Sequence, residues 1–188
     1  MGMPEQTLLS LAEARGLKAT FFFGSDVLES SRRWCQAIRP GPMFTDVHDR
    51  SFDPQNGTIV ANLRGERLTF SRDSADLDVY VCGFMCSPFT KNGQRQEWQH
   101  EHSNTFFACI TTIVCLRPRC FVLENVVGIS NNTSFEVVEE ALARVSGYVV
   151  HKVRRDAVEF GIPQHRPRLF FVGLRLDALK PEIAEAPQ

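Results

Sequence analysis

The stretch "LDVYVCGFMCSPFT" (residues 77–90) joins an apolar run to a cysteine on a proline-containing loop. Residues 77–84 are rich in β-branched and aromatic side chains, a composition that predicts a buried strand. Cys86 follows this strand directly, and Pro88 restricts the backbone two residues later. A thiol in this position has three interpretations, as a packing residue, as a metal or redox ligand, or as a nucleophile.

The next segments predict a second strand that runs parallel to the first. "NTFFACITTIVCLRP" (104–118) carries a helical stripe of apolar residues and ends at a proline, and "CFVLENV" (120–126) predicts a strand. A helix of crossover length makes the two strands it connects parallel. Ligands in open α/β sheets bind beyond the carboxyl ends of such strands. The sequence therefore places Cys86 and Glu124 at one edge of a sheet.

Strand and helix candidates alternate along the whole chain. This pattern predicts one domain of the α/β class, a doubly wound and mostly parallel sheet with helices on both faces. Residues 48–76 are polar and are predicted to be mostly irregular, with a turn at 55–57. The remaining candidates are helices at 7–16, 28–38 and 134–147, and strands at 19–24, 43–47, 148–155 and 168–174.

Composition and charge limit the class of protein. The 188 residues are 43% hydrophobic and carry a formal net charge of −1, so any contact with nucleic acid must use a local basic surface. The N-terminus does not resemble a signal peptide, and no apolar stretch approaches the length of a membrane span. We expect an intracellular protein, nuclear if the source is eukaryotic and otherwise in the cytoplasm or nucleoid.

The cysteine spacing argues against zinc and against a disulfide framework. None of the six cysteines forms a C-x-x-C pair, and no histidine follows one at zinc-finger spacing. The five besides Cys86 are predicted to be buried core residues, and no metal is expected.

A third segment, "FGIPQHRPRLFFVG" (160–173), places Arg166 and Arg168 just before an apolar strand. Two arginines flanking a proline can hold carbonyl or phosphate oxygens through hydrogen bonds of fixed geometry. The alternative is a solvated basic turn, which is the commoner role of an isolated R-x-R. The nearby Lys152, Arg154 and Arg155 are likewise more often a solvated strand end than a DNA contact.

"GFMCSPFT", "ENV" and "GIPQHRPR…VG", in this order, resemble the signature motifs of DNA cytosine-5 methyltransferases. The resemblance covers roughly residues 20–175 and implies a Rossmann-like fold that binds S-adenosylmethionine. Met85 and Ser87 depart from the family's usual proline and glutamine. The family's opening F-x-G-x-G loop and its target-recognition region have no counterpart, so residues 1–188 are predicted to be a single partial catalytic domain.

The resemblance assigns a catalytic role to each motif. It implies that the Cys86 thiolate attacks C6 of a cytosine swung out of a DNA duplex, so that C5 accepts the methyl group. It implies that Glu124 hydrogen-bonds or protonates ring N3. It further implies that Arg168 binds the base O2 and that Arg166 supports the pocket.

The resemblance also implies residues that bind S-adenosylmethionine. Asp26 maps onto the acidic residue that binds the ribose hydroxyls, and Asp46 onto the aspartate that accepts from the adenine amino group. Both are also short acidic residues at turns, where a structural role is common. Phe106 is a candidate for the same pocket, with core packing as the equal alternative.

Two further hypotheses remain beside DNA methylation. One is a catalytically silent fragment that acts as a binding module, or that is completed by a second, complementing chain. The other is methylation of transfer RNA, because one branch of the family uses the same residues on that substrate.

Overall fold

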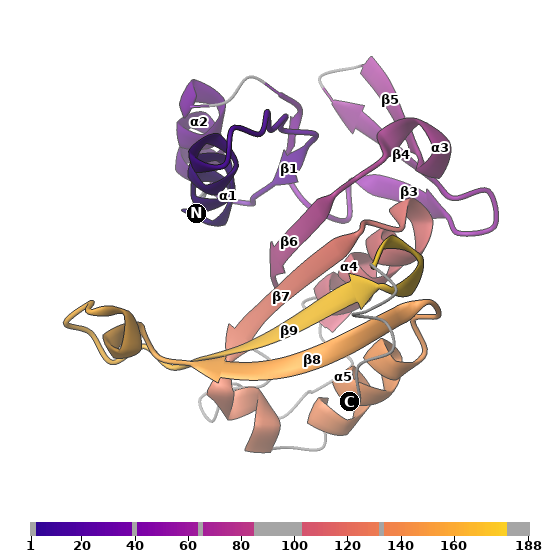
Figure 1. Ribbon diagram of the computed structural model, residues 1–188. Coiled ribbons are helices and arrows are strands. Elements are labelled where there is room, and N and C mark those ends of the chain that lie inside the picture. Colours follow the sequence, from indigo (N-terminus) through magenta and orange to yellow (C-terminus); the bar gives the residue numbers. More distant parts are fainter. Residues whose placement is uncertain (1–2, 39–40, 64–65, 85–102, 132–133, 180–188) are drawn as a thin grey trace.

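The main sheet carries both strands that flank the predicted site (Figure 1). Its order is β6 (Val79–Gly83), β7 (Cys120–Val126), β9 (Arg168–Arg175) and β8 (Tyr148–Arg155). β6 and β7 are parallel neighbours, as predicted. The computed structural model describes residues 3–38, 41–63, 66–84, 103–131 and 134–179.

The C-terminal half of this sheet differs from the mostly parallel arrangement that was expected. β9 runs antiparallel to both β7 and β8. β8 and β9 are joined by residues 156–167 without a crossover helix, and such a connection reverses the chain direction. The α/β class is confirmed, but the sheet is mixed.

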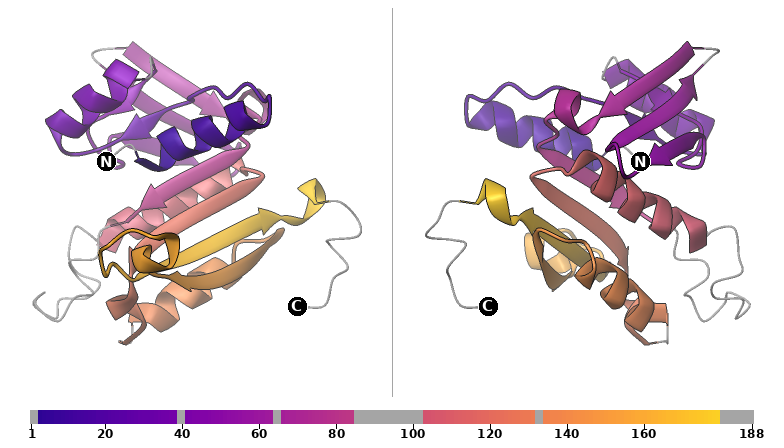
Figure 2. Two further views of the ribbon diagram at one scale, coloured as in Figure 1. Left: turned by 60° about the vertical axis from the view of Figure 1, so that its left-hand side comes forward. Right: turned by 90° about the vertical axis from the view of Figure 1, so that its right-hand side faces the viewer.

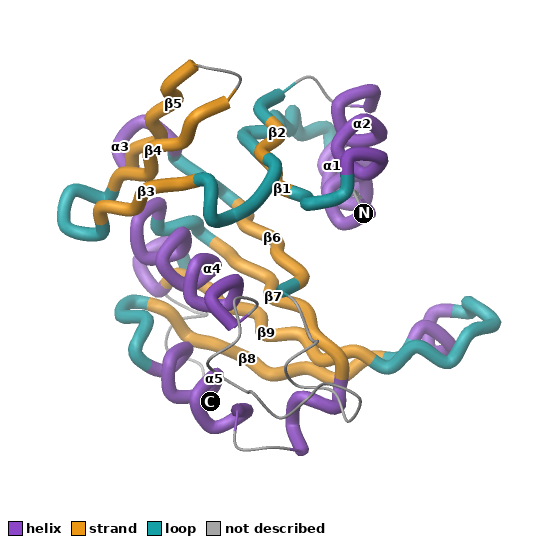
Figure 3. The backbone as a smooth tube through the Cα atoms, turned by 180° about the vertical axis from the view of Figure 1, so that it is seen from behind, coloured by secondary structure: helices purple, strands orange, loops and turns teal. Residues whose placement is uncertain are grey.

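Two helices, α4 (Ser103–Leu116) and α5 (Ser134–Ala143), cover one face of this sheet (Figures 2 and 3). Strand residues alternate between this face and the opposite one, so Phe121, Leu123 and Phe171 are buried while their neighbours are half-exposed. The main core joins these side chains to the apolar stripes of both helices. Helices at both faces were expected, but within the described residues α4 and α5 share one face.

Residues 48–76 are not irregular, contrary to the prediction. They form a three-stranded antiparallel meander of β3 (Arg50–Asp53), β4 (Thr58–Leu63) and β5 (Glu66–Ser71), followed by the short α3 (Arg72–Ala75). Ile59 and Ala61 alternate with less buried neighbours and pack a second core against α4. The predicted turn at 55–57 is confirmed, since it joins β3 to β4.

The N-terminal part contains α1 (Met3–Ala14), β1 (Gly24–Ser25), α2 (Glu29–Ile38) and β2 (Met43–Phe44). β1 and β2 form a separate parallel pair. The strand predicted at 19–24 is wrong for most of its length, because Phe22 and Phe23 pack their rings around Phe70 instead of joining a ladder. No helix of the described residues is long and apolar enough to cross a membrane.

The connection between β8 and β9 forms an arm that projects beyond the sheet in Figure 1. It contains the 3₁₀ helix η3 (Ala157–Phe160), which Asp156 and Glu159 close with a reciprocal capping box. Gly161 ends η3 with a positive φ of 78°. Two other 3₁₀ helices, η2 (Val127–Asn131) and η4 (Leu176–Ala178), follow β7 and β9.

Candidate active site

The site is centred on Glu124, near the carboxyl end of β7. Its register partner on β6 is Gly83, the last residue of that strand. Arg168, the first residue of β9, forms an ion pair with Glu124, with 2.6 Å between Arg168 Nε and Glu124 Oε1. The two side chains are 21% (Arg168) and 33% (Glu124) exposed, so the pair lies at a solvent-accessible edge of the sheet. The structure thus brings together two of the four predicted catalytic residues.

The alternation of β7 explains why Glu124 is accessible. Leu123 and Asn125 are buried on the face covered by the helices, and Glu124 between them projects to the opposite face. The Asn125 side-chain amide donates to the carbonyl of Phe84 (3.3 Å), and its oxygen accepts from the amide of Val126. Asn125 therefore fixes the end of β6 next to the end of β7.

Gly83 is part of the site because it leaves room for the carboxylate. A Cβ added at Gly83 would lie 3.1 Å from Glu124 Oε2. That separation is tighter than an ordinary van der Waals contact, so a larger residue would displace the carboxylate. Sequence reasoning did not assign Gly83 a role, although its place at the end of a predicted strand signals a close approach.

Arg166 lies on the arm, two residues before β9, and its side chain is exposed. Its backbone N–H donates to Asp156 Oδ1 at 2.8 Å, and His165 lies 3.4 Å from the other oxygen of that carboxylate. The hydrogen bond from Arg166 lowers the pKa of Asp156 below its ordinary value, with the contact to His165 acting in the same direction. Asp156 thereby fixes the backbone from which Arg166 projects. No motif in the sequence analysis included Asp156.

Asp26 and Asp46 lie just after β1 and β2, the two strands of the parallel pair. Ser25 pairs with Phe44, and the amide of Asp26 donates to the carbonyl of Phe44 (3.2 Å). One carboxylate oxygen of Asp26 accepts from the amide of Leu28, and one of Asp46 accepts from the amide of His48. These local turns hold both carboxylates at the same edge of the β1–β2 pair.

Two other predicted residues have different outcomes. Phe106 is fully buried in the main core, and its ring centroid lies 5.1 Å from that of Phe84, so core packing describes its position. Cys86 lies outside the described residues, and its role stays a prediction. Within the described ranges no three metal-ligating side chains gather into a possible ion site.

The geometry agrees with what comparison with known proteins shows. Residues 59–187 match the model of the family described as C-5 cytosine-specific DNA methylase. The chain belongs to this family. The match includes the strands that carry Glu124 and Arg168, so the methyltransferase motifs lie in the part of the fold that forms the site.

Bacterial relatives support the same assignment. The type II methyltransferase M.BsuFI of Bacillus subtilis is 37% identical over 108 residues, which are 56% of this chain and 26% of that protein. The type II methyltransferase M.Bsp6I of Bacillus sp. (strain RFL6) is 36% identical over 126 residues, which are 64% of this chain and 39% of that protein. The chain thus spans about a quarter to two fifths of these methyltransferases.

Solved structures show the same fold. The S. pombe Dnmt2 methyltransferase has a TM-score of 0.61 at 17% identity, and the alignment covers 98% of this chain and 53% of that one. A putative DNA modification methyltransferase from an E. coli prophage has a TM-score of 0.59 at 16% identity, with coverage of 93% and 46%. At this identity the likeness confirms the Rossmann-like methyltransferase fold alone.

Proposed function

We propose that this chain forms the catalytic part of an enzyme that transfers a methyl group from S-adenosylmethionine to C5 of cytosine in DNA. The observation that carries the proposal is the Glu124–Arg168 ion pair at the carboxyl edge of β7. It lies beside Gly83, from which the chain continues into the segment that contains Cys86. Membership of the C-5 cytosine-specific DNA methylase family supports the reaction class.

The pair suits recognition of the cytosine edge. Ring N3 and the O2 carbonyl are adjacent on cytosine, and Glu124 and Arg168 present a carboxyl group and a guanidinium that are in direct contact. A protonated carboxyl donates to N3 or gives it the proton, while the guanidinium donates to O2. Both contacts draw electron density from the ring and prepare C6 for nucleophilic attack.

Cys86 is the proposed nucleophile. Cys86 is the third residue after Gly83, a length of chain that spans at most about 11 Å. The Cys86 thiolate forms a bond to C6, which makes C5 nucleophilic. After C5 has gained the methyl group, a water molecule takes the C5 proton, the C5–C6 double bond re-forms, the C6–sulfur bond breaks, and the thiolate is restored. The target base has to leave the duplex stack to reach these groups.

The chemistry of Asp26 and Asp46 fits the methyl donor. Two carboxylates at the ends of adjacent parallel strands offer acceptors for ribose hydroxyls and for the adenine amino group. When bound, S-adenosylmethionine supplies an electrophilic methyl group. The local turns of both aspartates hold these acceptors in place before any ligand arrives.

Trapping with a modified base tests the proposal. The chain and its Cys86→Ala variant are incubated with a duplex that contains 5-fluorocytosine, with and without S-adenosylmethionine. Fluorine at C5 blocks the final elimination, so a competent enzyme stays covalently bound to the base. We expect a denaturation-resistant adduct that requires both Cys86 and the cofactor. Absence of the adduct would exclude activity for this chain alone, and an adduct in the alanine variant would exclude the covalent mechanism.

A further inference from the structure

Two cysteines outside the proposed catalytic set lie in direct contact. Cys82 is the fourth residue of β6, and Cys109 is in the middle of α4, the helix that covers this strand. Their sulfur atoms are 3.0 Å apart. Cys109 is fully buried, and Cys82 is half-buried and packs against the main core.

A buried cation, Arg50, interacts electrostatically with this pair. Arg50, on β3, is 8% exposed, and its guanidinium stacks on the rings of Phe23 and Phe44 at 4.6 and 5.3 Å. One of its nitrogens donates to Ser25, while its Nε and Nη1 have no hydrogen-bond partner among the described residues. A buried guanidinium without a carboxylate partner is costly, and a thiolate nearby would compensate its charge.

The environment shifts the pKa values of the two thiols in opposite directions. The hydrogen bond from Cys109 lowers the pKa of Cys82, and Tyr80 and Arg50 act in the same direction against the opposing effect of burial. The hydrogen bond to Cys82 raises the pKa of Cys109 well above its ordinary value, and burial adds to this effect. Cys82 is thus the thiol of the pair that loses its proton more readily, and Cys109 the one that keeps it.

We propose that Cys82 and Cys109 form an oxidation site in which hydrogen peroxide converts the two thiols into a disulfide that links β6 to α4. The argument rests on the 3.0 Å contact between the sulfur atoms, on the partial exposure of Cys82 and on the neighbouring Arg50. Bond formation requires the two sulfur atoms to approach by only about 1 Å.

The chemistry proceeds in two balanced steps. The Cys82 thiolate attacks one oxygen of hydrogen peroxide, the oxygen–oxygen bond breaks, and the leaving hydroxide takes a proton to become water. Cys82 is then a sulfenic acid. The Cys109 sulfur attacks the Cys82 sulfur, the sulfur–oxygen bond breaks, and a second water leaves with the Cys109 proton. An added dithiol reverses the reaction by becoming a disulfide itself.

The site adjoins the proposed catalytic edge without belonging to it. Cys82 precedes Gly83, the register partner of Glu124, and lies four residues before Cys86. Its register partner is Leu123, which is buried on the helix face, whereas Glu124 projects to the other face. A disulfide here would hold the end of β6 against α4.

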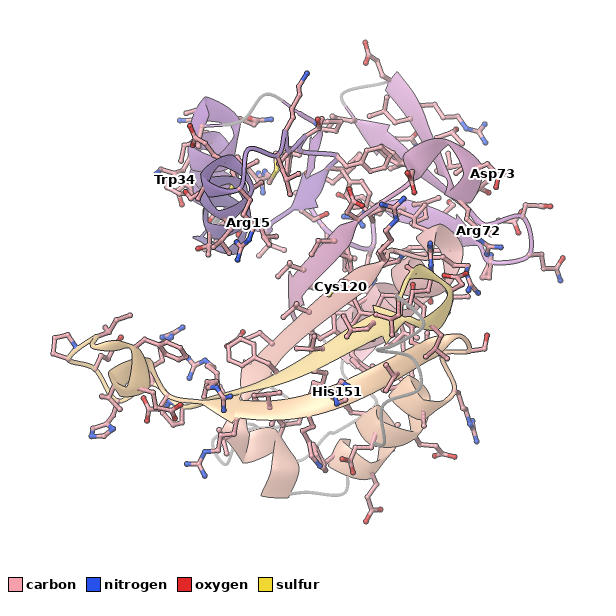
Figure 4. The ribbon with its side chains drawn as sticks, viewed as in Figure 1. Arg15, Trp34, Arg72, Asp73, Cys120 and His151 are labelled. Atoms are coloured by element: carbon pink, nitrogen blue, oxygen red, sulfur yellow. The ribbon has the colours of Figure 1, made fainter. Side chains whose placement is uncertain are left out.

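Peptide mapping tests the proposal on the full chain. The Cys86→Ser protein is treated with hydrogen peroxide, digested without reduction and analysed by mass spectrometry. We expect a linked peptide containing Cys82 and Cys109, lighter by two hydrogen atoms than the separate peptides and released by dithiothreitol. Cys120→Ser is the matched control, because Cys120 is also half-buried but lies at the start of β7 (Figure 4). This substitution should leave the crosslink between Cys82 and Cys109 intact.

Two variants separate the steps. In Cys109→Ser the sulfenic acid at Cys82 should persist and be captured by dimedone. In Arg50→Met the oxidation of Cys82 near pH 7 should slow by roughly three- to fourfold for each unit by which its pKa rises, because the loss of thiolate is partly offset by its greater nucleophilicity. Circular dichroism before oxidation establishes that each variant is folded, and Arg50→Lys, which keeps the charge, should retain most of the rate.

Three results would overturn the proposal. The first is a Cys82–Cys86 crosslink in wild-type protein in place of the Cys82–Cys109 one. The second is oxidation of Cys82 in the folded chain no faster than that of Cys120. The third is a Cys82–Cys109 link that forms equally fast in urea, since the native contact between the sulfur atoms would then contribute nothing.

Discussion

At the scale of single residues, Gly83 matters for the position of the Glu124 carboxylate more than for the stability of the fold. We predict that Gly83→Ala displaces the Glu124 carboxylate and weakens its ion pair with Arg168, because the new Cβ would lie 3.1 Å from Glu124 Oε2. The free energy of unfolding should change by less than about 1 kcal/mol, since alanine is no worse than glycine within a strand and the carboxylate is flexible. The yield of the 5-fluorocytosine adduct should fall by roughly tenfold or more.

NMR gives a readout of this change that does not depend on activity. Arg168 Nε lies 2.6 Å from Glu124 Oε1 in the ion pair, so hydrogen exchange at this guanidinium should accelerate when Gly83→Ala weakens the pair. Gly128→Ala on η2 is the matched control, because its Cβ would meet only Val126 Cγ2, at 4.0 Å. Unchanged exchange of the Arg168 Nε–H in Gly83→Ala would contradict the role given to Gly83.

Tyr148 provides a prediction about pH. Its hydroxyl donates to the carbonyl of Pro118 at 2.5 Å, and burial raises its pKa to about 12. Below pH 10 the hydroxyl is protonated in both the folded and the unfolded state, so its stabilising effect is complete. Between pH 10 and 12 the unfolded chain loses this proton first, and stability therefore falls as the pH rises.

The Tyr148→Phe variant isolates this effect. The stability of wild type relative to Tyr148→Phe should decrease by about 1 kcal/mol between about pH 9 and pH 11.5, a value reduced from the full effect because the ring is half-exposed. Urea unfolding at the two pH values measures it. Tyr80, whose pKa burial also raises, is present in both proteins and cancels in the difference. A difference that is constant with pH would refute the prediction.

At the scale of elements, α4 connects the two cores, and Arg72 holds its C-terminal end. Arg72 Nε donates to the carbonyl of Cys115 (3.2 Å) and its Nη2 to that of Val114 (3.1 Å) (Figure 4). A cation at a helix C-terminus satisfies carbonyls that have no partner within the helix. We predict that Arg72→Met lowers the free energy of unfolding by roughly 1–3 kcal/mol, as measured by urea denaturation.

Hydrogen exchange localises this loss. The amides of the last turn of α4 should exchange faster in Arg72→Met, while those of β8 and β9 should change only through the global loss of stability. Arg67→Met on β5 is the control, because Arg67 is exposed and its loss should cost no more than about 0.5 kcal/mol. Equal destabilisation by the two substitutions would show that the contacts to α4 are unimportant.

The elements that the sequence predicted well are those whose hydrophobic pattern is contained within a short stretch of the chain. The apolar runs at 77–84 and 120–126, separated by a helical stripe, predicted the parallel pair β6–β7 and the position of Glu124. The meander was missed because Ile59 and Ala61 are buried by contact with α4, which the polar sequence around them does not reveal. The strand at 19–24 was placed wrongly because ring packing of Phe22 and Phe23 outweighed their strand propensity.

At the scale of the whole molecule, the sheet order concentrates basic residues that a net charge of −1 conceals. Arg155, the last residue of β8, pairs in register with Arg168, which contacts Glu124. Arg154 directly precedes Arg155, Arg166 lies two residues before Arg168, and both are exposed. Sequence reasoning could not foresee this gathering, because it depends on β8 and β9 running antiparallel beside β7.

This basic edge predicts where DNA binds, if the proposed substrate is correct. We expect the double variant Arg154→Gln, Arg155→Gln to bind duplex DNA more weakly, since both residues are exposed at the end of β8 that lies beside Arg168. The slope of log affinity against log salt should become shallower by roughly 0.9 for each arginine that contacts a phosphate. Titration of a fluorescent duplex at several salt concentrations measures both quantities.

The matched control replaces an arginine that lies away from the Glu124–Arg168 ion pair. Arg144 lies after α5, on the helix-covered face, and pairs with Glu140 at 2.6 Å. Arg144→Gln changes the net charge by one unit but should leave the salt slope as it is in wild type. If Arg144→Gln and the β8 double variant weakened DNA binding only in proportion to the charge removed, the affinity would depend on the net charge of the chain and not on contacts at β8. A slope that changes only in the β8 variant would place the phosphate contacts at the edge where Glu124 and Arg168 meet.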